Sequence, residues 1–238
     1  MRTFFTKISH SFSSPSALLA ALLLVLPAVL FLLSRSSLSS SIFRDTGHYT
    51  VVLDAGHGGT DPGKVSASGV EEKDVNLDIA LKCRSVLKQN GITVILTRDS
   101  DESLEDSSSA YKKASDLRNR KKIMTENQAD CAVSIHQNSF PDPAQHGSQV
   151  FYHPSSEEGK KLASCIQNQT KSLLGQENRR EIKSNGDYYL LRDNPVPTVI
   201  AEICFLSNPS EAEMITDESI QERAAFAIAM GIMQYLCS

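Results

Sequence analysis

Short apolar segments alternate with segments of helical periodicity over most of this chain. The apolar segments are rich in β-branched residues, as buried strands are, and they predict strands at 49–55, 92–97, 131–135, 148–152, 188–191 and 198–203. Apolar residues that recur every three or four positions predict helices at 75–89, 111–127, 157–174 and 219–236. Strands that are apolar along their whole length are covered on both faces. The alternation therefore predicts a single α/β domain over residues 48–238, with helices on both faces of its sheet.

The N-terminal residues follow a different pattern. Residues 17–33 are uncharged and almost entirely apolar, and Arg2 and Lys7 precede them. A positive flank before an apolar run is typical of a signal peptide or a signal anchor, although the run is slightly shorter than the roughly 20 residues that span a bilayer. We assign residues 1–35 to this segment and the serine-rich residues 36–47 to a tether. A buried core helix is the alternative for the apolar run.

This segment decides where the rest of the chain is expected. Arg2 and Lys7 should stay in the cytoplasm, which places the domain on the outer face of the cytoplasmic membrane or in the cell wall. No Ala-x-Ala cleavage site follows the apolar run. An uncleaved membrane anchor is therefore favoured over secretion.

The charge of the exported part argues against nucleic acid as a partner. Residues 1–45 hold four of the 24 Lys and Arg residues and one of the 28 Asp and Glu residues, so residues 46–238 carry 20 positive and 27 negative side chains. A net charge of −7 is unfavourable for binding phosphate backbones. We expect a local group of basic residues to be the solvated face of a helix: Arg118, Arg120, Lys121 and Lys122.

The cysteines are scattered and include no CxxC pair. Their odd number leaves at least one thiol free in an exported chain, and their spacing is not that of a disulfide framework or a zinc cluster. We expect small buried side chains without a redox role. The five residues are Cys83, Cys131, Cys165, Cys204 and Cys237.

Candidate chemistry appears where strands are predicted to end, because ligands of open α/β sheets gather at the carboxyl ends of strands. His57 follows the first strand in a glycine-rich loop, and His136 follows the third. Glu202 lies near the end of the last strand, and Glu72 opens the first helix. Histidine and carboxylate are zinc ligands, and three of them leave a fourth tetrahedral position for water. His57, Glu72 and His136 would form such an open, catalytic site.

Glu202 has a different expected role. Bound zinc lowers the pKa of its water toward about 7 and polarises the attacked carbonyl group. A separate carboxylate could accept the proton from that water and pass it to the leaving amine. The pattern indicates metal-assisted amide hydrolysis, with Glu202 as the general base.

Each of these residues also has an interpretation without catalysis. His57 and His136 could merely fill turns, and Glu72 could complement the dipole at the start of its helix. Glu202 inside an apolar strand is harder to explain in this way, because a buried carboxylate without a partner is costly. The remaining histidines lack a comparable setting: His10, His48, His146 and His153.

Five ordered sequence blocks carry a family resemblance: VVLDAGHGGTDPG (51–63), GVEEKDVNLDIA (69–80), ILTRDSD (95–101), ADCAVSIHQNSF (129–140) and VIAEICFLSNPSE (199–211). Over residues 49–236 the chain resembles zinc-dependent N-acetylmuramoyl-L-alanine amidases that consist of a catalytic domain only. The resemblance implies one zinc ion per chain, held by His57, Glu72 and His136, with Glu202 as the catalytic base. It also implies a central, mostly parallel sheet of roughly six strands.

The resemblance adds detail and also reveals departures. It selects Glu72 over the preceding glutamate, because the family's ligand directly precedes Lys-Asp. Asn138 and Arg192 fall where substrate contacts are expected. Cys204 replaces the family's usual glycine in its Glu-x-Gly-Phe segment. Residues 140–146 are too few for the helical insert that covers the metal in some septum-splitting relatives.

The sequence therefore predicts cleavage of the amide between N-acetylmuramic acid and L-alanine, with peptidoglycan as the partner. Segments 151–163 and 178–192 and the short anchored layout are most similar to the sporulation-associated branch, whose members cut stem peptides from the spore cortex. Two alternatives remain open, namely a zinc peptidase that cuts within the stem peptide and a non-catalytic wall-binding protein. The sequence identifies no activating protein partner.

Overall fold

A six-stranded sheet organises the part of the chain that the structure, a computed structural model, describes: residues 49–175 and 177–238. Its strands are β1 (Thr50–Ala55), β2 (Thr93–Leu96), β3 (Cys131–Asn138), β4 (Gln149–Tyr152), β5 (Lys183–Ser184) and β6 (Thr198–Phe205). They lie in the order β2-β1-β3-β6-β4-β5. The first four in this order are parallel, β4 is antiparallel to β6, and β5 is parallel to β4. The predicted α/β fold with a mostly parallel sheet is confirmed.

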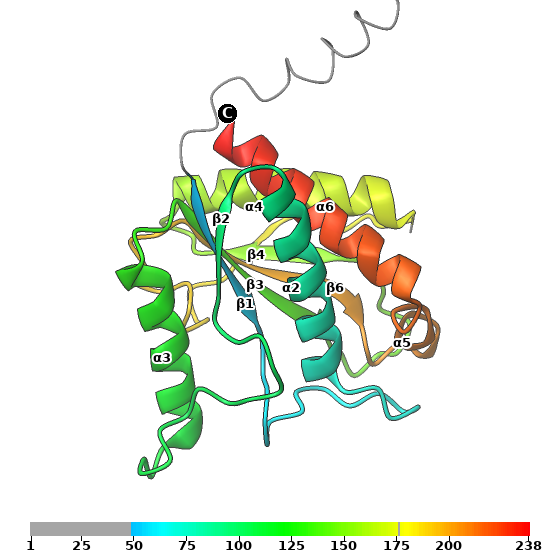
Figure 1. Ribbon diagram of the computed structural model, residues 1–238. Helices are drawn as coiled ribbons and strands as arrows, with labels where there is room; N and C mark the ends of the chain where they lie inside the picture. The colour runs from blue at the N-terminus through cyan, green and yellow to red at the C-terminus, as the bar shows by residue number, and fades with distance from the viewer. Residues whose placement is uncertain (1–48, 176) are drawn as a thin grey trace, which may run out of the picture. The chain divides into compact units, whose positions relative to one another are not determined.

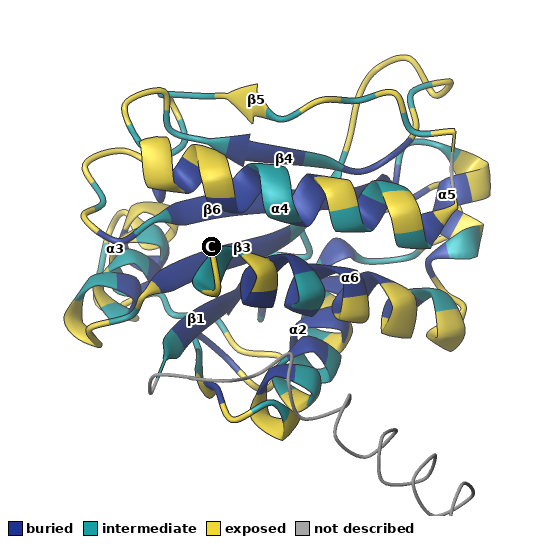
Figure 2. Ribbon diagram, turned by 90° about the horizontal axis from the view of Figure 1, so that it is seen from above, coloured by how far each residue is buried: buried dark blue, intermediate teal, exposed yellow. Residues whose placement is uncertain are grey.

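Helices cover both faces of this sheet (Figure 1). One face packs against α2 (Glu72–Gln89), α4 (Glu157–Leu174) and α6 (Glu218–Leu236), and the other against α3 (Lys112–Glu126). Strand β1 serves both faces, since Val51 and Leu53 join the cluster under the three helices while Val52 packs with Met124 of α3. The central strands are buried almost throughout, whereas α4 and α6 expose one side (Figure 2).

The predicted signal segment (1–35) and tether (36–47) lie outside the described residues. Within the described ranges, no helix combines the length and the apolar character that crossing a bilayer requires.

Residues 188–191, predicted as a strand, form a turn instead. The Asn185 side-chain oxygen accepts hydrogen bonds from the backbone N–H groups of Asp187 and Tyr188, and the Tyr188 carbonyl accepts one from the Leu191 N–H. Such bonds favour turns over strands. Leu190 and Leu191 are nevertheless buried. The apolar composition of residues 188–191 therefore predicted their burial correctly but not their backbone conformation.

Two strands run further than predicted, and one helix was not predicted. Strand β3 continues to Asn138, which places His136 inside the strand, and β6 continues to Phe205. The additional helix is α5 (Pro209–Met214). Asn208 begins it by accepting hydrogen bonds from the N–H groups of the second and third residues that follow.

The expectation that Arg120 is solvated is wrong. Its side chain is 2% exposed and lies between α3 and the sheet, where it pairs with Asp54 at 2.8 Å and with Asp116 at 2.7 Å. It also donates hydrogen bonds to the carbonyl oxygens of Ala55 and His57. Arg120 therefore connects α3 to the end of β1 and to the loop that follows it.

Asp54, which pairs with Arg120, is fully buried. Burial disfavours its ionised form, but Arg120 and the hydroxyl groups of Ser134 and Thr97 outweigh this effect and hold the pKa of Asp54 below its ordinary value. Asp54 is thus a buried carboxylate whose charge is compensated within the fold. Removal of one partner from such a pair leaves an uncompensated charge.

We predict that Arg120→Met lowers the free energy of unfolding by about 3–5 kcal/mol, because it leaves Asp54 buried without its cation. Denaturant unfolding followed by circular dichroism measures the change. Arg118→Met is the matched control, since Arg118 is exposed on the same helix, and it should alter stability by no more than about 0.5 kcal/mol. Equal effects of the two substitutions would show that the buried pair does not support the fold.

Candidate functional site

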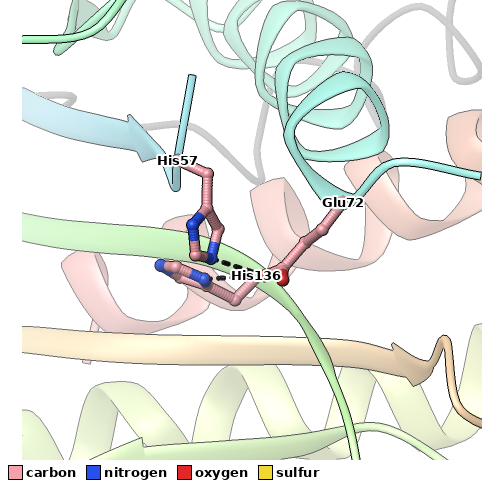
Figure 3. Close-up of side chains that lie close together, drawn as sticks. All are labelled: His57, Glu72 and His136. Atoms are coloured by element: carbon pink, nitrogen blue, oxygen red, sulfur yellow. Dashed lines mark hydrogen bonds and ion pairs between the residues drawn. The ribbon is translucent and has the colours of Figure 1, made fainter. Parts of the chain in front are cut away.

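His57, Glu72 and His136 converge at the carboxyl ends of β1 and β3 (Figure 3). Each offers a ligand atom, and these three atoms all lie within 4.8 Å of one another. Glu72 Oε1 lies 3.2 Å from His57 Nε2 and 2.9 Å from His136 Nδ1. The side chains come from the loop after β1, the first turn of α2 and the end of β3, as the strand-end rule predicts.

Glu72 is fixed by the backbone around it. Its side chain is 5% exposed. Oε2 accepts a hydrogen bond from the Lys64 N–H at 2.8 Å, and Oε1 accepts one from the Gln137 N–H at 3.0 Å. Burial disfavours the carboxylate, but hydrogen bonds and charge from His136 and His57 outweigh this effect and lower the pKa of Glu72. The interpretation of Glu72 as a helix-dipole acid alone does not account for these contacts.

Two glycines leave the space that the cluster occupies. A Cβ atom at Gly56 would lie 2.3 Å from His136 Nε2, and one at Gly63 would lie 2.6 Å from Glu72 Oε2 and 2.7 Å from His57 Cδ2. Gly63 also has a φ of 67°, which favours glycine. The glycine-rich loop after β1 therefore has a steric function, because it lets both imidazoles and the carboxylate approach one another.

His57 is held in a backbone conformation that few residues adopt. Its φ is 64°, in the left-handed region, where strain of this kind gathers at functional sites. The ring nitrogen turned away from Glu72, Nδ1, donates a hydrogen bond to Asp61 Oδ2 at 2.9 Å. The sequence interpretation did not include Asp61, although it lies four residues after His57 in the same loop.

Glu202 is the cross-strand neighbour of His136 in the register of β3 and β6. Paired residues on neighbouring strands point to the same face of the sheet, so its side chain is directed to the side on which His136 lies. Glu202 is 9% exposed, and its Oε2 is a buried oxygen that has no hydrogen-bond partner among the described residues. Burial raises the pKa of Glu202 to about 7, against the opposing charge of His136. These are the properties of a proton acceptor near neutral pH.

Cys204, the departure from the family pattern, lies behind the cluster and not in it. Its thiol is fully buried and donates a hydrogen bond to Gln137 Oε1 at 3.1 Å. The Gln137 amide in turn donates to Asn76 Oδ1, and Asn76 Nδ2 donates to the Gly56 carbonyl. The substitution therefore adds a polar partner beneath the site. Of the other cysteines, Cys83 and Cys131 are buried as expected, whereas Cys237 is exposed, and all five are free.

The two expected substrate contacts lie in different surroundings. Asn138 ends β3 two residues after His136, and its side chain accepts a hydrogen bond from the Ser139 N–H. The Arg192 side chain is 53% exposed and its guanidinium lies 5.9 Å from the centre of the Tyr189 ring. Both side chains are accessible to a ligand, and their contact with substrate stays a prediction.

Comparisons with known proteins identify the family of this chain. The family model described as N-acetylmuramoyl-L-alanine amidase matches residues 51–234. The chain is 37% identical over 188 residues to the germination-specific N-acetylmuramoyl-L-alanine amidase of Bacillus subtilis (strain 168), with 78% of each chain covered.

Solved structures give the same result. The CwlD amidase of Clostridioides difficile, solved in complex with the GerS lipoprotein, is similar at 42% identity and a TM-score of 0.77, over 79% of this chain and 98% of that one. The catalytic domain of CwlV, an amidase of Bacillus (Paenibacillus) polymyxa var. colistinus, is similar at 34% identity and a TM-score of 0.70, over 79% and 98%. These matches favour an enzyme over a non-catalytic wall-binding protein. This chain belongs to the N-acetylmuramoyl-L-alanine amidase family, whose enzymes act on peptidoglycan.

Proposed function

We propose that this amidase works with one zinc ion, held by His57, Glu72 and His136, and with Glu202 as its general base. The observation that carries the proposal is the convergence of three ligand atoms within 4.8 Å at the ends of the parallel strands. Glu202 Oε2, a buried oxygen without a hydrogen-bond partner in the part of the chain that the structure describes, supports it independently. The bond cleaved is the amide between N-acetylmuramic acid and L-alanine of peptidoglycan.

The donor set suits zinc better than a hard cation. Two imidazoles and one carboxylate match the three protein ligands of catalytic zinc sites, whereas calcium and magnesium take oxygen ligands almost exclusively. The absence of a Cβ atom at Gly56 and Gly63 leaves the space that these three side chains occupy. Bound there, zinc would polarise the scissile carbonyl group and make a water molecule more acidic.

Glu202 supplies the proton transfers. A carboxylate with a pKa of about 7 can accept a proton from the attacking water and later donate it to the departing amine, since its two protonation states are close in free energy near neutral pH. Its position beside His136 on the neighbouring strand keeps it on the same face of the sheet as that ligand. Asn138 and Arg192 would contact the substrate around this centre.

The biological setting follows from the relatives. The chain is similar to a germination-specific amidase and to CwlD, which supports the spore cortex as the wall that it modifies. Enzymes of this kind act outside the cytoplasm, and we propose that residues 1–35 anchor the chain to the membrane. The CwlD of Clostridioides difficile was solved in complex with the GerS lipoprotein, and this likeness supports a protein partner for the present chain as well.

We predict that Glu202→Gln retains zinc but lowers the rate of peptidoglycan hydrolysis by at least about 100-fold, the usual contribution of a general base. His57→Ala and His136→Ala should lose both zinc and activity. Metal content by mass spectrometry and released muropeptides measure the two properties separately. Glu222→Gln, an exposed position on α6, is the matched control and should hydrolyse at the wild-type rate. Near wild-type hydrolysis by Glu202→Gln would refute the base assignment.

Removal of metal by a chelator should abolish hydrolysis, and one equivalent of zinc should restore it. The reason is that the proposed reaction needs the metal to polarise the scissile carbonyl group and to make the attacking water more acidic. The new amine identifies the bond that is cut. Release of peptides that begin with L-alanine is the expected result. Peptides that begin with an internal residue of the stem would instead indicate the peptidase alternative, and full activity of a verified metal-free protein would contradict the metal assignment.

A further inference from the structure

Asp61 is an ionisable group beside the metal-ligand cluster, and the proposed reaction assigns it no function. It lies in the glycine-rich loop, outside the three-ligand cluster, and contacts only the far nitrogen of the His57 ring within that cluster: Asp61 Oδ2 lies 2.9 Å from Nδ1. The opposite nitrogen, Nε2, is the one that faces Glu72 at 3.2 Å. Asp61 and Glu72 therefore approach the same imidazole from its two sides.

The protonation of the His57 ring follows from this arrangement. Asp61 is placed as a hydrogen-bond acceptor by its contacts, because Lys113 Nζ and the Gly63 N–H both donate to its carboxylate. A carboxylate that receives two such donors acts as an acceptor, so its contact with His57 Nδ1 at 2.9 Å pairs it with a proton on that nitrogen. With Nδ1 directed to Asp61, the ring presents Nε2 to Glu72, and Nε2 is the nitrogen whose lone pair would bind a cation held between these side chains.

Asp61 is itself fixed from two directions. Its Oδ1 accepts a hydrogen bond from the Gly63 N–H at 3.1 Å, and its backbone forms a two-way bridge with Gly58. From the other side, Lys113 of α3 donates a hydrogen bond to Oδ2. The Asp61 carboxylate therefore has three hydrogen-bond partners: the Gly63 N–H of its own loop, the His57 ring and Lys113 of α3.

Two residues of α3 contact His57, Arg120 directly and Lys113 through Asp61. Arg120 donates a hydrogen bond to the His57 carbonyl oxygen and so fixes the backbone of a residue whose φ is 64°. Lys113, two turns earlier on the helix, acts on the ring through Asp61. Backbone and side chain of the same ligand are therefore both tied to one helix that contributes no ligand of its own.

We infer that Asp61 is a positioning residue that sets the tautomer and the ring orientation of His57, and that Lys113 holds Asp61 in place from α3. The inference rests on the proposed function, in which His57 Nε2 binds the metal. Outer partners of this kind typically change metal affinity by about 10- to 100-fold when they are removed. Lys113 is 58% exposed, and exposed ion pairs are weak, so its effect should be smaller.

Zinc affinity of the full chain, measured by competition with a chelating dye, tests the inference. Asp61→Asn keeps the size of the side chain and should weaken zinc binding by about 10- to 100-fold, and Lys113→Met should weaken it by up to about fivefold. The double variant should bind zinc no more weakly than Asp61→Asn alone, because Lys113 acts through Asp61. Lys112→Met is the matched control, since Lys112 pairs with Glu105 and not with the loop, and it should bind zinc as the wild type does.

A second readout separates positioning from a general loss of structure. In metal-free protein, the 15N chemical shifts of the His57 ring should report a proton on Nδ1 in the wild type and in Lys112→Met, and a shift toward the Nε2 tautomer in Asp61→Asn. Unchanged ring shifts together with wild-type zinc affinity in Asp61→Asn would overturn the inference. Failure of the wild type itself to bind zinc, or tight binding by His57→Ala, would instead overturn the proposed function on which it rests.

Discussion

The structure of the site depends on one carboxylate oxygen that lies between two imidazoles. Glu72 Oε1 is within 3.2 Å of His57 Nε2 and 2.9 Å of His136 Nδ1, and it also accepts a hydrogen bond from the Gln137 backbone. His57 comes from the loop after β1, His136 from the neighbouring parallel strand β3, and Glu72 from the helix that follows β1. Only a sheet whose strands end at one edge brings them together, and only glycine at positions 56 and 63 leaves room for them.

The rest of the fold can be understood as support for this cluster. On one side, Arg120 and Asp54 form a buried ion pair that joins α3 to the end of β1, and Arg120 extends to the His57 carbonyl. On the other side, Gln137, Asn76 and Cys204 form a chain of hydrogen bonds beneath Glu72. Both networks are buried and their main hydrogen-bonding groups are satisfied, which is the condition under which polar groups make a core more rigid. Glu202 Oε2 is different, because it is a buried oxygen with no hydrogen-bond partner among the described residues, which agrees with the base role proposed for it.

The sequence predicted the parts of this picture that depend on local pattern. Apolar runs located β1, β3 and β6, and the strand-end rule placed His57 and His136 at one edge of the sheet. The sequence pattern failed where contacts between residues far apart in the chain determine burial or conformation. Arg120 resembled a surface residue because its neighbours in the sequence are charged, yet Asp54, 66 residues away, draws it into the interior. Residues 188–191 are apolar and buried, but Asn185 turns the chain there. Asp61 was missed because a single aspartate in a glycine-rich loop has no periodicity, and the positioning role inferred for it rests on its distance to His57.

X-ray absorption at the zinc edge of the zinc-loaded protein tests most directly whether His57, Glu72 and His136 share one cation. We predict a single site with two imidazole nitrogens and carboxylate oxygen at about 2.0–2.2 Å, completed by one further light atom. The chain has five free cysteines, which makes the contrary result easy to recognise. A sulfur shell at about 2.3 Å, or a spectrum without imidazole scattering, would mean that zinc binds elsewhere.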